Sequence, residues 1–197
     1  MSSEDQKRTI EQKKEKVLES AIKRFSKKGY DATTISEIAK DANVSFGLVS
    51  TYYGNKEELF TVCVTKPAES YLEEMLKFNT QPAIFKTEIS QMIKNHIKII
   101  YNRKDYLRLL VQVNSQYERF PKAFQVANLY TQKLTKKIEL LIRNGQMADQ
   151  LASGNTEKIA IAYVSLLFGL RLSYADDPTS EDWNQFAEIA LRLFGPK

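Results

Sequence analysis

The sequence feature that most constrains the fold is the stretch of residues 33–60, TTISEIAKDANVSFGLVSTYYGNKEELF. The two threonines at its start are residue types that cap helix N-termini, and the apolar residues after them are spaced as on one face of a short helix. Asn43 tolerates a left-handed turn, and Ser45 can cap a second short helix, expected over residues 46–53. Two short helices joined by such a turn are typical of a helix-turn-helix.

A set of characteristic positions falls in order and without gaps over residues 14–60, about a quarter of the chain. These positions are Lys16-Val17-Leu18, Phe25, Gly29-Tyr30, Thr33-Thr34, Ile38-Ala39, Val44-Ser45, Gly47, Tyr52-Tyr53 and Lys56-Glu57. With them, residues 14–60 resemble the DNA-binding region of the TetR-like transcriptional regulators. For the whole chain, the resemblance implies a homodimer with an N-terminal three-helix DNA-binding domain and a C-terminal helical bundle.

Length and composition set looser limits. A chain of 197 residues can form one or two domains and bury a sizeable core without cross-links. Its single cysteine, Cys63, excludes an internal disulfide and suits a reducing compartment. The longest apolar stretch, residues 159–170, is too short to cross a bilayer, and no signal peptide is recognised. We therefore expect a cytoplasmic protein without a membrane span.

Charge alone does not indicate a nucleic-acid partner. The formal net charge is +5, which weakly favours an anionic partner. Residues 1–60, however, hold 11 Lys and Arg against 10 Asp and Glu, a net charge of +1. DNA binding is therefore predicted from the helix pattern and the resemblance.

The apolar periodicity predicts an all-α fold of about nine helices. Residues 1–60 would form the helix-turn-helix DNA-binding domain, and residues 61–197 a bundle for ligand binding and dimerisation. A fourth helix is expected over residues 56–78, but Pro67 lies inside it, so a kink or a break is expected near Lys66. If this helix links the DNA reader to the rest, Pro67 can act as its joint.

The resemblance gives individual positions a role in DNA binding. The second short helix would enter the major groove with four residues near base edges, and Gly47 would let the backbone come close to the duplex. Ser36 falls where related proteins often carry a base-reading Arg, and N–H groups at helix starts can bind phosphates. The candidate DNA contacts are Thr33, Thr34, Ser36, Ser45, Phe46, Gly47, Leu48, Ser50, Thr51, Tyr52 and Lys56.

Three of these candidates depart from the expected pattern. Phe46 and Leu48 are apolar on a face meant for polar reading, and apolar side chains can specify a sequence by packing on thymine methyl groups. The hypothesis is that A·T pairs lie opposite them; the alternative is that one of them, Leu48 in particular, packs between the short helices. Ser50 replaces the Tyr usual at its position, which removes an expected phosphate contact.

The C-terminal part carries candidates for a dimer interface. A helix expected from about residue 156 to residue 175 is too apolar to bury only one face in its own core. Pairing of the last two helices with a second copy would cover the other face; the alternative is a helix central to a monomer. The candidate interface residues are Tyr163, Leu166, Leu167, Leu170, Trp183 and Phe186.

The resemblance also implies a ligand cavity in the bundle, where a few polar groups lie among apolar ones. Gln112 and Asn114 are the most informative, because buried amides need hydrogen-bond partners and a ligand can be one. Aromatic residues at helical spacing are more often plain core. The candidate ligand contacts are His96, Tyr106, Gln112, Asn114, Tyr117, Phe124, Phe168 and Arg171.

No catalytic, metal or cofactor motif is recognised, and the chain has one histidine and one cysteine. The sequence is interpreted as a ligand-responsive transcriptional regulator, by family habit a repressor. It would bind a near-palindromic double-stranded DNA operator as a homodimer and be released by a small hydrophobic or amphipathic effector. One alternative is a DNA-binding protein whose C-terminal bundle docks a protein partner; another is a helical enzyme with an incidental helix-turn-helix.

Overall fold

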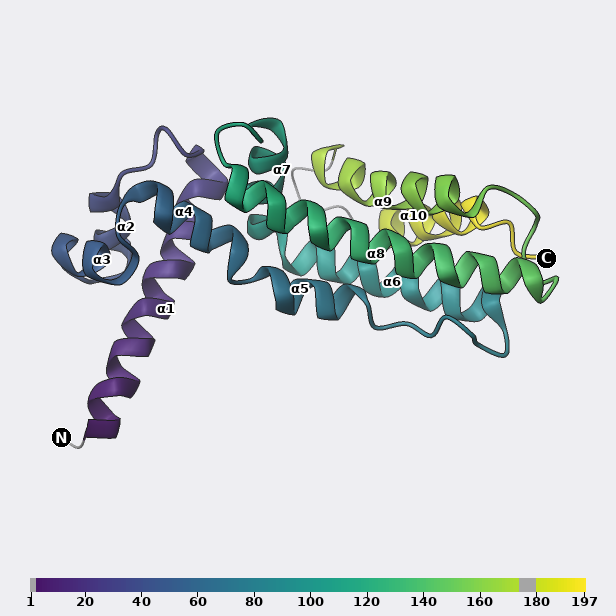
Figure 1. Ribbon diagram of the computed structural model, residues 1–197, viewed down its shortest axis with the longest axis horizontal. Coiled ribbons are helices and arrows are strands. Elements are labelled where there is room, and N and C mark those ends of the chain that lie inside the picture. The colour runs from purple at the N-terminus through teal and green to yellow at the C-terminus, as the bar shows by residue number, and fades with distance from the viewer. Residues whose placement is uncertain (1–2, 174–179) are drawn as a thin grey trace. The chain divides into compact units, whose positions relative to one another are not determined.

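The computed structural model describes residues 3–173 and 180–197, and these residues form ten α-helices (Figure 1). Within them there is no strand beyond an isolated bridge between Leu151 and Pro196, so the expected all-α class is confirmed. None of the described helices is long and apolar enough to cross a membrane. The helices are α1 (Ser3–Lys28), α2 (Ile35–Asp41), α3 (Phe46–Tyr53), α4 (Lys56–Thr65), α5 (Ala68–Met75), α6 (Phe85–Asn102), α7 (Lys104–Ser115), α8 (Pro121–Met147), α9 (Thr156–Ser173) and α10 (Ser180–Leu193).

The tenth helix arises from a break at Pro67. The stretch expected as one helix is divided into α4 and α5, and Lys66 is the C-cap residue of α4. Proline has no N–H to donate to the preceding turn, and its ring crowds the carbonyl four residues earlier, so an uninterrupted helix is disfavoured. The expected interruption near Lys66 is therefore confirmed, whereas a role of Pro67 as a joint stays a prediction.

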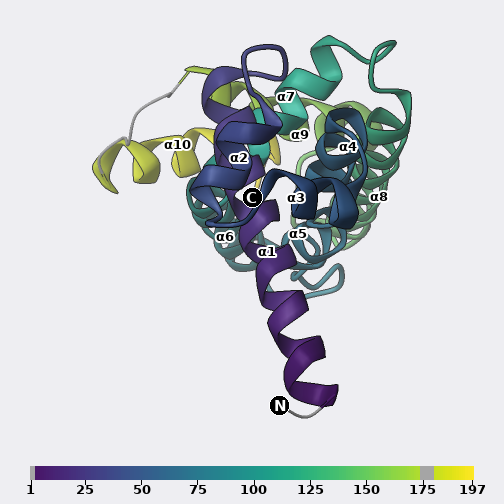
Figure 2. The same ribbon diagram turned by 90° about the vertical axis from the view of Figure 1, so that its left-hand side faces the viewer.

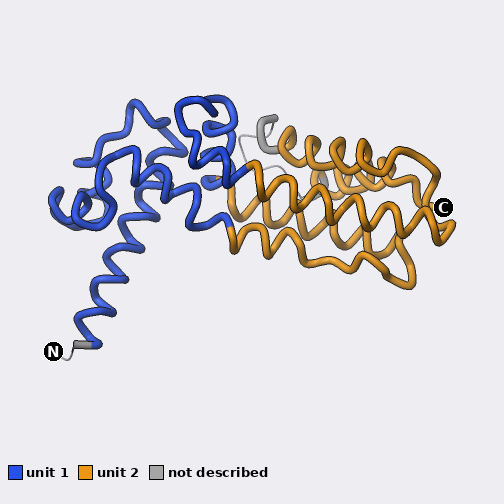
Figure 3. The backbone as a smooth tube through the Cα atoms, viewed as in Figure 1, with its two compact units in different colours: residues 1–68, 105–127 blue, residues 69–104, 128–197 orange. Residues whose placement is uncertain are grey.

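The described residues fall into two compact units (Figure 3). Unit 1 runs up to Ala68 and also includes Asp105–Ala127, so it holds α1 to α4, nearly all of α7 and the start of α8. Unit 2 consists of Glu69–Lys104 and Asn128–Lys197. The division of roles after residue 60 stays a prediction, since unit 1 also takes in a segment from the middle of the chain.

An aromatic cluster forms the core of unit 1. Phe25 of α1 meets Phe60 of α4 edge to face, with ring centroids 5.1 Å apart. Tyr30 stacks on Phe25 and lies 5.0 Å from Phe120, which in turn lies 4.5 Å from Phe60. Offset and edge-to-face pairs at these distances are favourable beyond the area they bury. The cluster therefore joins α1, α4 and the residue that precedes α8.

Hydrogen bonds from α7 fasten it to the same core. Gln112 Nε2 donates to the backbone oxygen of Phe25 at 2.9 Å, and the Tyr106 hydroxyl donates to the backbone oxygen of Val64 at 2.9 Å. The Ser26 hydroxyl also bonds to an oxygen of the Asp105 carboxylate at 3.0 Å. Side chains of α7 thus bind carbonyls near the ends of α1 and α4; the oxygen of Phe25 also accepts from the N–H of Gly29 at 2.9 Å.

In unit 2, a buried histidine joins three elements. His96 of α6 has its Nε2 atom 2.7 Å from the backbone oxygen of Met75 and its Nδ1 atom 2.9 Å from the hydroxyl of Tyr163 of α9. Because a carbonyl can only accept, Nε2 carries the proton and Nδ1 accepts from Tyr163. The ring of Tyr163 packs on Phe194, and that of His96 on Phe78. The neutral imidazole is therefore a structural hydrogen-bonding group.

This burial makes the stability of the fold depend on pH. Burial lowers the pKa of His96 from 6.5 to about 4. The unfolded chain then binds a proton between these two values while the folded chain does not, so the stability is present above pH 6.5 and falls as the pH drops toward 4. We expect the free energy of unfolding, measured with urea, to fall by up to roughly 3 kcal/mol over that window.

The control variant is His96→Gln, which keeps a donor but cannot titrate. We expect it to be less stable than the wild type at pH 7.5 and to show a flat profile between pH 5 and 6.5, a range above the titration of ordinary carboxylates. A slope in this variant as steep as that of the wild type would assign the pH dependence to other groups.

Candidate nucleic-acid interface

The start of α2 is fixed by a capping box. The Thr34 side chain accepts from the N–H of Glu37 at 3.2 Å, and a carboxylate oxygen of Glu37 accepts from the N–H of Thr34 at 3.0 Å. Thr33 has another task, because it is fully buried and its hydroxyl donates to the backbone oxygen of Gly29 at 2.8 Å. Ser36, in the first turn of α2, is exposed. Thr33 therefore orders the approach to α2, while Thr34 and Ser36 lie at the surface.

The turn between α2 and α3 has the backbone that the sequence predicted. Asn43 has φ of 54°, in the left-handed region, and the N–H of Val44 returns to the backbone oxygen of Ala39 at 3.0 Å. The side chain of Ser45 caps α3 by accepting from the N–H of Leu48 at 3.3 Å. The two helices are thus held as a helix-turn-helix.

One face of α3 is open to solvent. Phe46 is 57% exposed, and Gly47, Ser50 and Thr51 are exposed as well. No atom lies within 4 Å of the place where a Cβ on Gly47 would stand, so the backbone there can be approached closely. Leu48 is half-buried. Of the two apolar side chains, Leu48 is therefore the better candidate for packing between the short helices. The exposed face of α3 therefore presents an aromatic ring, a glycine backbone and hydroxyl groups to solvent.

Two further groups flank α3. Asn55 caps α4 in a second capping box with Glu58, after Gly54 turns the chain with a φ of 73° that favours glycine. At the end of α3, the ring of the half-buried Tyr52 lies 5.8 Å from the Lys14 ammonium nitrogen of α1. The Tyr53 hydroxyl donates to the backbone oxygen of Lys14 at 2.8 Å. The start of α4 and the middle of α1 thus both lie beside the C-terminal end of α3.

Acidic groups of α2 are paired with cations of α1. Arg24 bonds to the Asp41 carboxylate through Nε at 2.5 Å and through Nη2 at 2.7 Å. Lys28 Nζ bonds to Glu37 at 2.7 Å, and this bond, together with those from Thr34, lowers the pKa of Glu37 to about 2. Both carboxylates therefore stay ionised and paired near neutral pH, and their cations fix α2 against α1.

These elements carry the candidate DNA contacts of the sequence analysis, all of which lie in unit 1 at the start of α2, along α3 and at the start of α4 (Figure 2). Lys14 of α1 was not among these candidates, although it lies beside Tyr52 of α3. This neighbour could not be predicted from the sequence.

The motif geometry agrees with a match to a known family. Residues 17–63 match the family described as bacterial regulatory proteins, tetR family. Residues 17–63 belong to this family. The match identifies residues 17–63 as the helix-turn-helix region of a bacterial regulatory protein, as the sequence analysis expected.

Curated tetR-type regulators are similar over part of their length. IcaR of Staphylococcus epidermidis, named a negative transcriptional regulator of the biofilm operon icaADBC, is 29% identical over 106 residues, which are 53% of this chain and 55% of that protein. HbdR of an Aromatoleum species, named an HTH-type transcriptional regulator, is 33% identical over 66 residues, 34% of this chain and 29% of that protein. The chain thus spans about half the length, or less, of the curated relatives it matches.

Solved structures of the tetR family share the fold. A bacterial regulatory protein in the tetR family from Rhodococcus RHA1 has a TM-score of 0.78 at 23% identity and covers 94% of this chain and 98% of its own. The TetR family regulator PfmR from Thermus thermophilus has a TM-score of 0.68 at 20% identity, with coverage of 89% and 97%. At these identities the likeness shows the all-α fold with its N-terminal helix-turn-helix.

The expected ligand contacts of a tetR-type bundle are divided between the two units. His96 and Phe168 lie in unit 2, while the side chain of Arg171 lies outside the described part of the structure. Asn114 is exposed and donates to the backbone oxygen of Leu110, so the expectation of a buried amide there is wrong. The candidates in unit 1 are Tyr106, Gln112, Asn114, Tyr117 and Phe124.

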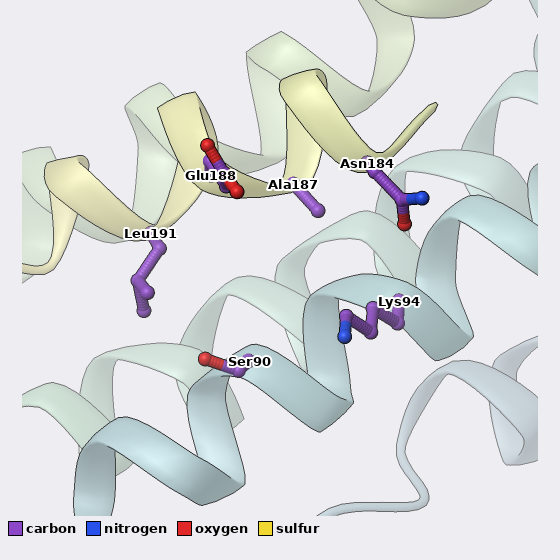
Figure 4. Close-up of a pocket in the computed structure, with 6 residues that line it drawn as sticks. All are labelled: Ser90, Lys94, Asn184, Ala187, Glu188 and Leu191. Carbon is purple, nitrogen blue, oxygen red and sulfur yellow. The ribbon is translucent and has the colours of Figure 1, made fainter. Parts of the chain in front are cut away.

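A pocket of about 390 Å³ lies between α6 and α10 of unit 2 (Figure 4). Ala187 and Leu191 of α10 point toward α6, and the pocket lining also includes the oppositely charged Lys94 of α6 and Glu188 of α10. None of the sequence-predicted ligand contacts lines it. No sequence signal could have found this pocket, because it depends on how α10 packs on α6. Its lining residues are Ser90, Lys94, Asn184, Ala187, Glu188 and Leu191.

The candidate dimer contacts divide into two groups. Tyr163, Leu167 and Leu170 are buried within the chain itself, so they have little surface left for a second copy. Leu166, Trp183 and Phe186 remain partly exposed. Two residues that the sequence analysis did not choose are more accessible: Ile161 of α9 is 42% exposed and Ile189 of α10 is 54% exposed. Each of these two helices therefore has an exposed apolar side chain, and the dimer interface stays a prediction.

The exposed Phe46 leads to a prediction about DNA readout. If its ring packs on thymine methyl groups, Phe46→Ala should weaken operator binding by roughly 1–2 kcal/mol, and replacing the facing thymines by uracil should weaken the wild type similarly. The affinity of the variant should stay the same when these thymines are replaced by uracil. Binding is measured by fluorescence anisotropy on matched duplexes. Equal losses for the wild type and the variant when the methyl groups are removed would rule out this contact.

Proposed function

We propose that this chain is a transcriptional repressor that binds a near-palindromic DNA operator as a homodimer and is released by a small hydrophobic or amphipathic effector. One observation carries the proposal: α3 is capped at Ser45 and exposes one face to solvent, and the helices before and after it in the chain, α2 and α4, also have capped starts. A helix of eight residues with such a face fits the major groove.

Phosphate contacts would fix the register of this helix on the duplex. The N–H groups in the first turn of a helix point out of its end, and the helix dipole favours an anion there. At α2, the capping box engages Thr34 and Glu37 and leaves the first-turn donors of Ile35 and Ser36 for a phosphate. Lys56, at the first position of α4, adds a full positive charge. These contacts position the protein but carry no sequence information.

A homodimer would match two half-sites. The exposed Ile161 and Ile189 are large apolar residues of the last two helices, and a second copy related by a two-fold axis could cover both. Recognition helices of such a dimer reach successive major grooves when they are about 34–36 Å apart. A near-palindromic operator then mirrors the symmetry of the protein.

Similarity to a named repressor supports repression, and coupling between effector binding and DNA binding would explain release. The similarity to IcaR, a named negative regulator, favours a repressor over an activator. An effector that binds better to the conformer with the wrong separation of recognition helices would shift the population off DNA. A small effector suits the tetR-type bundle. The alternative is that the bundle binds a protein partner.

The test of the proposed function is selection of bound DNA from genomic fragments by the purified protein at physiological salt. We expect a short near-palindrome with a steep decrease of affinity as salt rises, because phosphate contacts release counterions. Its neighbouring genes would indicate the effector class. Weak binding without sequence preference would overturn the repressor proposal, and a search for protein partners of the bundle would follow.

The dimer is tested by Ile189→Glu, with Met147→Glu as the matched control. Met147 of α8 is also a large exposed apolar residue, 81% exposed, but it lies on a helix outside the proposed interface. Placing a carboxylate at a buried interface costs several-fold or more in affinity, so sedimentation should show the first variant shifted toward monomer and the control unchanged. A wild type that is monomeric, or an interface variant as dimeric as the control, would contradict this interface.

A further inference from the structure

Four side chains of unit 1 form one charged cluster beside the start of α4. Tyr30 is at its centre: the Lys56 ammonium nitrogen lies 4.4 Å from the ring centroid, and the Arg119 guanidinium carbon lies 4.8 Å from it. Asp31 joins the same two cations. Its backbone oxygen accepts from Lys56 Nζ at 3.2 Å, and its carboxylate pairs with Arg119.

The pair between Arg119 and Asp31 is bidentate. Arg119 Nη1 donates to Asp31 Oδ2 at 2.9 Å, and Nη2 donates to Oδ1 at 2.6 Å. Two parallel bonds are the strong form of an arginine–carboxylate pair, and they hold the pKa of Asp31 below its usual range. Both carboxylate oxygens are thus bonded to Arg119, although Lys56 lies against the same residue.

The turn between α7 and α8 holds Arg119 in place. Its N–H donates to the backbone oxygen of Gln116 at 3.0 Å, and its Nη1 also bonds to the Gln116 side-chain oxygen at 3.3 Å. The next residue, Phe120, is buried in the aromatic cluster against Phe60 and Tyr30. Arg119 is therefore directed to Asp31 by its own turn as well as by the ion pair.

We propose that Arg119 is a positioning residue for DNA binding: it occupies the Asp31 carboxylate so that the Lys56 ammonium can turn to a DNA phosphate. The proposal rests on the proposed function, because Lys56 has this role only if the chain binds DNA. Without Arg119, an unpaired carboxylate would stand beside Lys56. It would attract the ammonium and repel the phosphate, and both effects are strongest at short distance.

Two other roles of Arg119 lead to different results. If Arg119 itself contacts a phosphate, its loss weakens binding whatever stands at position 31. If the ion pair is only a clamp on the turn, then loss of Asp31 weakens binding as much as loss of Arg119. In the positioning role, by contrast, the harm comes from the bare carboxylate and disappears when that carboxylate is removed too.

The experiment is a double-mutant cycle of Arg119→Gln and Asp31→Asn, read by affinity for the selected operator at several salt concentrations. We expect Arg119→Gln to bind about 3–10-fold more weakly, with a salt slope smaller by about one counterion. Asp31→Asn should bind no more weakly than the wild type, and the double variant should bind within about twofold of Asp31→Asn. An Asp31→Asn variant as weak as Arg119→Gln, or a double variant as weak as Arg119→Gln, overturns the proposal.

A second cycle tests whether Arg119 acts through Lys56. In a Lys56→Gln background, adding Arg119→Gln should change affinity by less than about twofold, because the residue it positions is absent. If Arg119→Gln still causes its full loss of affinity in the Lys56→Gln background, the positioning role is overturned. Arg143→Gln is the matched charge control, since it removes an arginine paired with a carboxylate, Glu139, in unit 2, and it should bind as the wild type does.

The two proposals fail in different ways. A wild type without sequence preference for DNA overturns the proposed function. A wild type that binds its operator, with Arg119→Gln binding equally well, overturns only the role of Arg119. Thermal unfolding of each variant shows whether it is folded, and a variant that unfolds early is replaced by Arg119→Lys, which keeps the charge but cannot form the two-bond pair. That variant should lose part of the affinity.

Discussion

The structure of unit 1 depends on the packing of Phe25, Tyr30, Phe60 and Phe120 against one another. Each ring comes from a different place in the chain: the end of α1, the connection that follows it, the middle of α4 and the residue before α8. The helix-turn-helix has a small core of its own, with Val49 as the buried residue of α3. The aromatic contacts therefore fix the directions of α1 and α4, between which α2 and α3 are held.

The local features of the DNA-reading motif could be predicted because their causes are local. The caps at Thr34 and Ser45, the left-handed Asn43 and the break at Pro67 each depend on a few neighbouring residues and on backbone preferences that hold in most contexts. The structure has all four. The all-α class follows from apolar periodicity for the same reason, since each helix reveals its own buried face.

The rest depends on contacts between residues far apart in the chain, which no spacing rule contains. Tyr163 looked like an interface residue because α9 is apolar throughout, yet it is fully buried and bonded to His96, 67 residues away. Asn114 looked like a buried amide because apolar residues surround it in sequence, but its own direction on α7 is outward. Periodicity can show that a helix has two apolar faces, but it does not show which face its own bundle covers.

Charge illustrates this limit most directly. Residues 1–60 carry almost equal numbers of acidic and basic side chains, so their sum does not favour DNA. Among the described residues, the structure pairs five of these acids with cations: Glu11 with Lys14, Glu15 with Lys66, Asp31 with Arg119, Glu37 with Lys28, and Asp41 with Arg24. Opposite charges paired at short distance largely cancel each other's field at distances greater than their own separation. The field near α3 thus depends on which acids are paired, and for Asp31 the partner lies 88 residues away in the chain, beyond the reach of any count over the motif.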